Sequence, residues 1–267
     1  MIHLRQILAG SDRTERLDRA VLELASIQFP GLDPAPFLAQ LNDLASHLGD
    51  RLRNFNDGRD FVEKAQRFLF EEHGFHGNQT DYFDPRNSCL NQVLERRTGI
   101  PISLSVLYLE VARRLHMPVF GIDLPRHFVV QFDDGNYSTF IDPFHGGKAI
   151  TARECFALAE ARVADPALLR RTSNKRIALR MLRNLHNVYL RRKDLEKALT
   201  TLDLMLEGTP EVSAWYKLRG ALRLEMKQMR AAGDDLERYL AMEPAAPDRE
   251  EVVGQLKHIH QWLGRVN

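Results

Sequence analysis

The chain has 267 residues, enough for two modest domains or three small ones. Its 37 Lys and Arg residues against 36 Asp and Glu residues give a net charge of +1, which argues against a general nucleic-acid binder. The sequence has no apolar run near 18 residues, no apolar signal segment behind Met1 and too few cysteines for a disulfide framework, so we expect a soluble cytoplasmic protein with two free thiols and no membrane contact.

The first 75 residues indicate a helical region. Apolar residues recur there at helical spacing in three segments, residues 13–27, 33–48 and 60–72. His73-Gly74 is typical of a helix C-terminal stop. These helices carry no evident chemistry, and we expect region 1–75 to support the rest of the chain.

The middle of the chain predicts a mixed unit. A short helix near Leu90 is expected to end with Gly99 as its C-terminal glycine, and the next helix is expected over Ser103–Leu115 with Ser103 as N-cap. Val119–Ile122 reads as a strand, and a hairpin follows it. One helix followed by three short strands is typical of an α+β unit with a helix packed on an antiparallel sheet.

The hairpin over residues 125–142 predicts a contact between two polar side chains. Asp134-Gly135 is a strong two-residue turn signal, because a type I′ turn needs positive φ at both central positions. With this loop His127 lies directly opposite Asp142, at roughly 4.5–5.5 Å between Cβ atoms, close enough for imidazole to meet carboxylate. A loop centred on Gly135-Asn136 would break that pairing. The predicted register gives one face that is more polar: His127, Val129, Gln131, Ser138, Phe140 and Asp142.

The C-terminal part, after a connecting helix near residues 152–163, contains an internal repeat of 34 residues, the length of a tetratricopeptide repeat. The offset relates Leu190 to Leu224, Ala198 to Ala232, Leu202 to Leu236, Leu206 to Leu240 and Pro210 to Pro244. His186 stands where the second repeat has Gly220, and Met205 stands where such repeats usually have alanine, so the pair is best described as TPR-like. A helix over 248–263 would cap the array.

Together these segments make the chain resemble the bacterial SirB-type family, in which a transglutaminase-like core precedes tetratricopeptide repeats. The resemblance is carried by Asp84-Pro85-Arg86-Asn87-Ser88, Leu90-Asn91-Gln92-Val93-Leu94, Arg97-Thr98-Gly99-Ile100-Pro101-Ile102-Ser103, Leu124-Pro125-Arg126-His127-Phe128 and Ile141-Asp142-Pro143-Phe144. It implies an α+β protein with a helical N-terminal region (1–75), a transglutaminase-like, cysteine-protease-like core with a small antiparallel sheet (76–168) and C-terminal α-helical TPR-like repeats (172–267).

The resemblance also implies where an active site would lie. Transglutaminase-like enzymes resemble cysteine proteases in using a Cys at a helix N-terminus, then a His and an Asp on neighbouring strands. His127 and Asp142 match the second and third positions, but the nucleophile position falls on Pro101. The family typically has Gly where this chain has Arg126.

Two functional hypotheses follow. Because proline supplies no nucleophile, we favour a non-catalytic protein that binds a protein or peptide partner through its repeats and a vestigial cleft. The polar contributors to this cleft would be Asn87, Asn91, Arg97 and Arg126. The alternative is a hydrolase or acyl transferase in which Ser103 or Cys89 acts with His127 and Asp142, although Ser103 also suits a helix cap and Cys89 a buried core thiol.

No cofactor or metal is expected from the sequence. The pairs His73/His76 and His258/His260 have suggestive spacing, but no Cys or carboxylate cluster joins either pair at a ligand interval. Gly146-Gly147 is not followed by Lys-Ser/Thr, so it is not a phosphate loop. A nucleic-acid-binding regulator is disfavoured by the balanced charge.

Overall fold

The computed structural model describes residues 1–10, 16–53 and 57–266, and the chain divides into two compact units. The first unit comprises residues 1–7 and the described part of 11–181, and the second comprises residues 8–10 and 182–267. Among the described residues no helix combines the length and the apolar character needed to cross a membrane.

The N-terminal region is helical, as predicted. Its α-helices are α1 (Ile2–Leu8), α2 (Leu17–Ala25), α3 (Ala35–Arg51) and α4 (Gly58–Gln66). The sequence did not predict α1, and residues 13–15 of the first predicted helix lie outside the described residues. The Asp57 side chain caps α4, which continues into a π-helical turn, Arg67–Glu72. Gly74, with φ of +69°, follows the end of this turn, so the predicted stop is confirmed.

Helix α6 (Pro101–Arg114) is the centre of the first unit and is buried along most of its length. It begins two residues earlier than predicted, because Pro101 suits the first helical position, and Ile100 rather than Ser103 is its N-cap. The preceding helix α5 (Leu90–Arg96) ends in a left-handed residue, Arg97, so the prediction that Gly99 ends it was wrong. Gly99 lies instead in a two-residue strand, β2 (Thr98–Gly99), paired in parallel with β1 (His76–Gly77).

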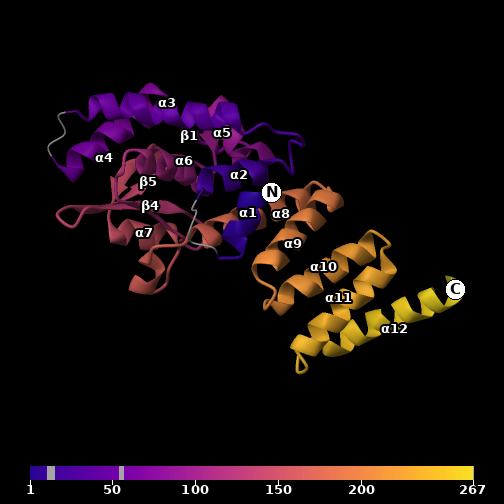
Figure 1. The fold of residues 1–267 in the computed structure, drawn as a ribbon. Coiled ribbons are helices and arrows are strands. Elements are labelled where there is room, and N and C mark those ends of the chain that lie inside the picture. The colour runs from indigo at the N-terminus through magenta and orange to yellow at the C-terminus, as the bar shows by residue number, and fades with distance from the viewer. Residues whose placement is uncertain (11–15, 54–56, 267) are drawn as a thin grey trace. The chain divides into compact units, whose positions relative to one another are not determined.

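The main sheet has four antiparallel strands in chain order: β3 (Val119–Ile122), β4 (Val129–Asp133), β5 (Ser138–Asp142) and β6 (Lys148–Ile150). Helix α6 packs against the sheet, at β3 and β4 (Figure 1). On α7 (Ala152–Leu158), Cys155 belongs to a core cluster with Ile122 and Val129. The predicted α+β unit is therefore present, with β6 as an added strand.

The predicted hairpin register was wrong by two residues along one strand. Asp133 pairs with Ser138, which places Gly135-Asn136 at the centre of the loop. Asp134 cannot form the loop centre because its N–H donates to the Tyr137 carbonyl at 3.2 Å and its carboxylate accepts the N–H of Tyr137. Gly135, with φ of +88°, supplies the positive φ that a type II′ turn needs first. Since the shift is two residues, each side chain keeps its predicted face.

The second unit contains antiparallel helix pairs with the predicted 34-residue repeat. Its helices are α8 (Asn174–Arg191), which begins in the first unit, then α9 (Leu195–Gly208), α10 (Ser213–Glu225), α11 (Met229–Met242) and α12 (Arg249–Val266). A Cβ on Gly220 would lie 2.9 Å from Leu236, so glycine permits close packing of α10 on α11. In the first repeat the buried His186 ring occupies this place and bonds to the Ala198 carbonyl oxygen.

Candidate functional site

His127 and Asp142 meet, as the sequence predicted. His127 lies just before β4 and Asp142 ends β5, with His127 Nε2 3.0 Å from Asp142 Oδ2. Both are buried, with 7% and 2% of their surfaces exposed. The two residues are not directly opposite each other in the sheet, because the observed register, continued by one pair, places Val129 opposite Asp142. His127 instead contacts the carboxylate from the loop before β4. The catalytic role of the pair stays a prediction.

A third side chain, His145, joins this pair and was missed by the sequence reasoning. Its Nδ1 lies 2.7 Å from the same Asp142 oxygen, Oδ2, while Oδ1 accepts the backbone N–H groups of Phe144 and His145. Burial raises the pKa of Asp142, but the hydrogen bonds from His127 and His145 outweigh it and hold the pKa below its usual value. The available signal was the spacing Asp142-Pro143, because a capping Asp before Pro starts a 3-10 turn and brings residue i+3 back to the cap.

The turn that carries His145 is held on several sides. The two imidazole rings stack at 5.7 Å between centroids, and Phe144 meets the His127 ring edge-on at 6.0 Å. The Gly147 N–H donates to the Asp142 carbonyl at 2.8 Å. A Cβ on Gly77 would lie 2.5 Å from the Phe144 ring, so β1 contacts the turn closely. We call His127, Asp142 and His145 the His–Asp–His cluster.

The His–Asp–His cluster borders a cavity of about 410 Å³. The cavity is lined by Asp142, His145, Lys148, Ile150, Glu154, Ala157 and Leu158. Glu154 is held by Thr151, whose backbone N–H and hydroxyl donate to its carboxylate at 2.7 and 2.8 Å. His145 is exposed, so the cluster is reached from solvent on its side.

Ser103 is engaged elsewhere. It is fully buried; its Oγ donates to the Asn87 carbonyl oxygen at 2.5 Å and accepts the N–H of Ile100 at 3.0 Å. The hydroxyl therefore caps the start of α6 from inside the helix and ties it to the 3-10 turn Pro85–Ser88. These bonds use the hydroxyl proton that a general base would have to remove.

The four polar residues predicted to line a cleft occupy separate environments. Asn87 is buried, and its amide donates to the Asp81 carbonyl oxygen at 2.7 Å. Asn91 is also buried, and its Oδ1 has no hydrogen-bond partner among the described residues. Arg97 donates to the His73 carbonyl oxygen. Arg126 is exposed in an ion pair with Glu160, and its φ of +61° is a backbone conformation that favours glycine.

Both thiols are buried. Cys89 and Cys155 each have 0% of their surface exposed, and burial raises the pKa of each to about 12. The Cys89 thiol donates to the Pro85 carbonyl oxygen at 3.4 Å. A thiol with such a raised pKa forms little thiolate near neutral pH, so neither side chain has the environment of an activated nucleophile.

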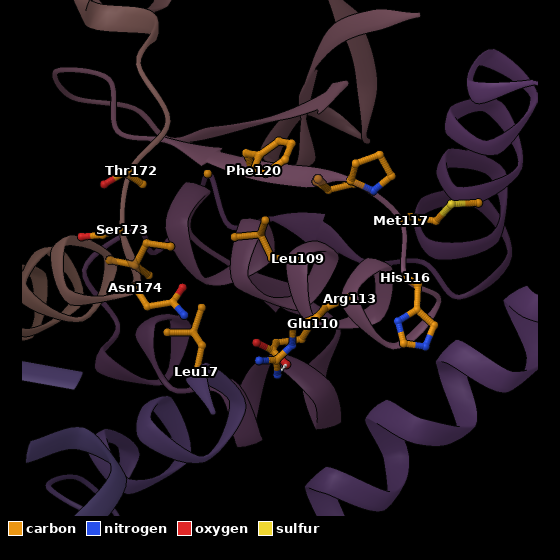
Figure 2. A pocket seen from close by; sticks show the side chains of 14 residues that line it. Leu17, Leu109, Glu110, Arg113, His116, Met117, Phe120, Thr172, Ser173 and Asn174 are labelled. Atoms are coloured by element: carbon orange, nitrogen blue, oxygen red, sulfur yellow. Dashed lines mark hydrogen bonds and ion pairs between the residues drawn. The ribbon is translucent and has the colours of Figure 1, made fainter. Parts of the chain in front are cut away.

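A second cavity, of about 450 Å³, lies at the C-terminal end of α6. Figure 2 shows its lining coming from separate segments: Leu17, the last turns of α6, residues 116–121 and residues 172–174. Glu110 and Arg113 form an ion pair on its wall. Sequence reasoning missed this cavity, because no local motif links segments so far apart along the chain.

The comparisons with known proteins agree with both parts of the fold. The sequence pattern of the transglutaminase-like superfamily matches residues 35–183, and that of a tetratricopeptide repeat matches residues 185–257. The chain belongs to the transglutaminase-like superfamily and carries tetratricopeptide repeats behind that domain.

The similar proteins include bacterial UPF0162 proteins and a eukaryotic F-box protein. A UPF0162 protein of Xylella fastidiosa (strain Temecula1) is 32% identical over 253 residues, 92% of this chain and 90% of the relative. A UPF0162 protein of Pseudomonas aeruginosa is 29% identical, over 85% of this chain and 84% of that one. F-box only protein 21 of Mus musculus is 38% identical over 125 residues, 44% of this chain but 20% of the mouse protein.

Proposed function

We propose that this chain is a non-catalytic transglutaminase-like protein of the cytoplasm. In this proposal its C-terminal repeats, region 172–267, bind a protein or peptide partner rather than nucleic acid, and the surroundings of His127 and Asp142 are a vestigial active site. The support comes from the side chains that would have to act as nucleophiles and from the surface of the repeats.

The observation that carries the proposal is the environment of Ser103. The resemblance places the nucleophile position on Pro101, and Ser103 is the nearest hydroxyl in sequence to that position. Its Oγ donates to the Asn87 carbonyl oxygen, while His127 Nε2 is directed to Asp142. Activation by His127 would require Ser103 to break buried hydrogen bonds, each worth about 1 kcal/mol net and more when a buried partner is left unsatisfied.

Each of the two repeats has one exposed leucine on its first helix, and these two side chains support the proposal that the repeats bind a partner. Helix α10 buries Gly220 and Leu222 and leaves Leu218 43% exposed. Leu190, near the end of α8, is 39% exposed. These helices come first in their repeats, and stacked helical repeats use such extended surfaces to bind other proteins.

A site-specific crosslinking experiment tests the partner surface. A photo-crosslinking amino acid is introduced at Leu218 or Leu190 of the full chain, and at Val163, an exposed apolar residue of the first unit, as the matched control. In cells we expect a discrete adduct from 218 or 190 that position 163 does not give, and Leu218→Glu should abolish the adduct from 190. Equal adducts from all three positions, or none from the repeat positions, would contradict binding by the repeats.

Active-site probes test the non-catalytic part separately. We expect no covalent labelling of Ser103 or Cys89 by serine-directed or thiol-directed probes in the native protein. Labelling of either residue that His127→Ala removes would establish the alternative, a hydrolase or acyl transferase.

A further inference from the structure

We propose that the His–Asp–His cluster is a binding site for a divalent transition-metal ion of the zinc class. The ligand atoms are His127 Nε2, Asp142 Oδ2 and His145 Nδ1. This inference does not depend on the proposed binding function of the repeats, because all three ligands lie in the first unit.

The three donor atoms converge on one point. They all lie within 4.8 Å of one another, with Asp142 Oδ2 3.0 Å from His127 Nε2 and 2.7 Å from His145 Nδ1. In a tetrahedral zinc site with bonds of about 2.0–2.1 Å, neighbouring ligand atoms are about 3.3 Å apart. The two nitrogen–oxygen distances are about 0.3 and 0.6 Å shorter than this spacing, and the two nitrogens lie at most 4.8 Å apart. Reaching the tetrahedral spacing therefore takes a movement of the exposed His145 ring.

The donor set selects the class of ion. Two imidazole nitrogens and one carboxylate oxygen suit Zn²⁺, Co²⁺, Ni²⁺ or Fe²⁺, whereas Mg²⁺ and Ca²⁺ prefer sites made of oxygen ligands. Three protein ligands leave at least one coordination position for water or an added ligand, as in open zinc sites. The adjacent cavity of about 410 Å³ offers room for that ligand, and Lys148 on its wall favours an anionic one.

The cluster is also arranged before any ion binds. Asp142 Oδ1 is occupied by the N–H groups of Phe144 and His145, which turns Oδ2 toward the two rings. His127 is fixed by burial and by the edge of Phe144. The His127 and His145 rings both donate an N–H to Asp142 Oδ2. A bound metal ion would take the place of these two protons between the ring nitrogens and the carboxylate oxygen.

The test is a Co²⁺ titration of the full chain after removal of metals with a chelator. The visible absorption of Co²⁺ reports its coordination, and equilibrium dialysis gives the stoichiometry and Kd. We expect one Co²⁺ per chain with nitrogen–oxygen coordination of low coordination number, competed by Zn²⁺. Because His145→Gln removes a direct ligand, it should weaken binding by at least about 100-fold, the upper end of the effect of losing an outer-shell partner.

Matched variants make the result decisive. His47→Gln removes another exposed histidine and should leave the Kd unchanged. Asp142→Asn tests whether the carboxylate is a ligand. If this buried change prevents folding, His145→Gln still tests the site, because His145 is exposed and circular dichroism shows whether that variant is folded. Absence of binding at millimolar Co²⁺, or binding that His145→Gln and His47→Gln affect equally, would overturn the proposal.

Discussion

Ser103 Oγ donates a 2.5 Å hydrogen bond to the Asn87 carbonyl oxygen, which joins the first turn of α6 to the turn before α5. We predict that Ser103→Ala lowers the free energy of unfolding by about 1–3 kcal/mol, because the Asn87 carbonyl and the Ile100 N–H lose their buried partner. Chemical denaturation followed by circular dichroism measures the loss. Ser46→Ala, an exposed change on α3, is the control and should have almost no effect; an equal effect of the two would contradict a structural role for Ser103.

Arg114 neutralises two buried carboxylates. Its guanidinium lies 2.7 Å from Asp18 Oδ2 and 2.8 Å from Glu110 Oε2, and each carboxylate residue is 1% exposed. Arg113, which is more exposed, contacts both carboxylates as well and would compensate only part of the charge that Arg114→Ala leaves. The variant should therefore destabilise the protein by about 3 kcal/mol, the lower end for breaking a buried ion pair. Arg53→Ala, which breaks an exposed pair with Asp50, should cost about 0–1 kcal/mol. Denaturation midpoints of the two variants check the difference, and similar losses would show that the Arg114 pairs are not stabilising.

The buried His186 should make the second unit sensitive to acid. Burial lowers the pKa of His186 in the folded protein, so the unfolded chain takes up a proton below about pH 6.5 that the folded chain does not. Stability is therefore full above about pH 6.5 and falls as pH decreases toward the lowered folded pKa. The two tryptophans, Trp215 and Trp262, both belong to the second unit, so their fluorescence follows its unfolding. His186→Gln keeps a donor but cannot titrate and should show a shallower loss between pH 7 and 5; parallel curves would contradict this account.

Arg126 has a left-handed backbone conformation that favours glycine. Its φ is +61°, and its ion pair with Glu160 is largely exposed. Both Arg126→Gly and Arg126→Ala remove the pair, but only glycine relieves the backbone strain of about 1–2 kcal/mol. We therefore predict that the glycine variant unfolds at a higher temperature than the alanine variant, as measured by calorimetry. An alanine variant of equal or greater stability would show that the positive φ costs nothing here.

Local patterns predicted most helices and the repeat, because helical spacing and a 34-residue period are written in neighbouring residues. The hairpin register was less determined, since Asp134-Gly135 and Gly135-Asn136 both suit a two-residue turn and only the observed bonds of Asp134 distinguish them. His127 and Asp142 were predicted to meet through the wrong register, and they meet because the loop before β4 restores the contact.

The remaining parts of the candidate site depend on three-dimensional packing. His145 joins Asp142 because a capped 3-10 turn brings its ring beside that of His127, and the sequence indicates the turn but not the ring position. Ser103 was expected at the N-cap, where its hydroxyl would accept a backbone N–H of the first turn. Its place in the third position of α6 directs the hydroxyl to the Asn87 carbonyl oxygen, a contact between separate segments that the sequence did not predict.

Helix α8 has a practical consequence for dissecting the molecule. The division between the two compact units falls between Met181 and Leu182, inside a continuous helix. The side chains of Ile177, Ala178 and Met181 are buried in the part before the division, and Leu182 and Leu185 are buried in the part after it. Proteases cut extended chain far more readily than an intact helix, so digestion will not release the repeats at this junction. A shortened chain that stops before residue 174 would leave the first unit without an apolar segment that belongs to it, and a repeat fragment should begin upstream of Leu182 so that the helix keeps its first turns.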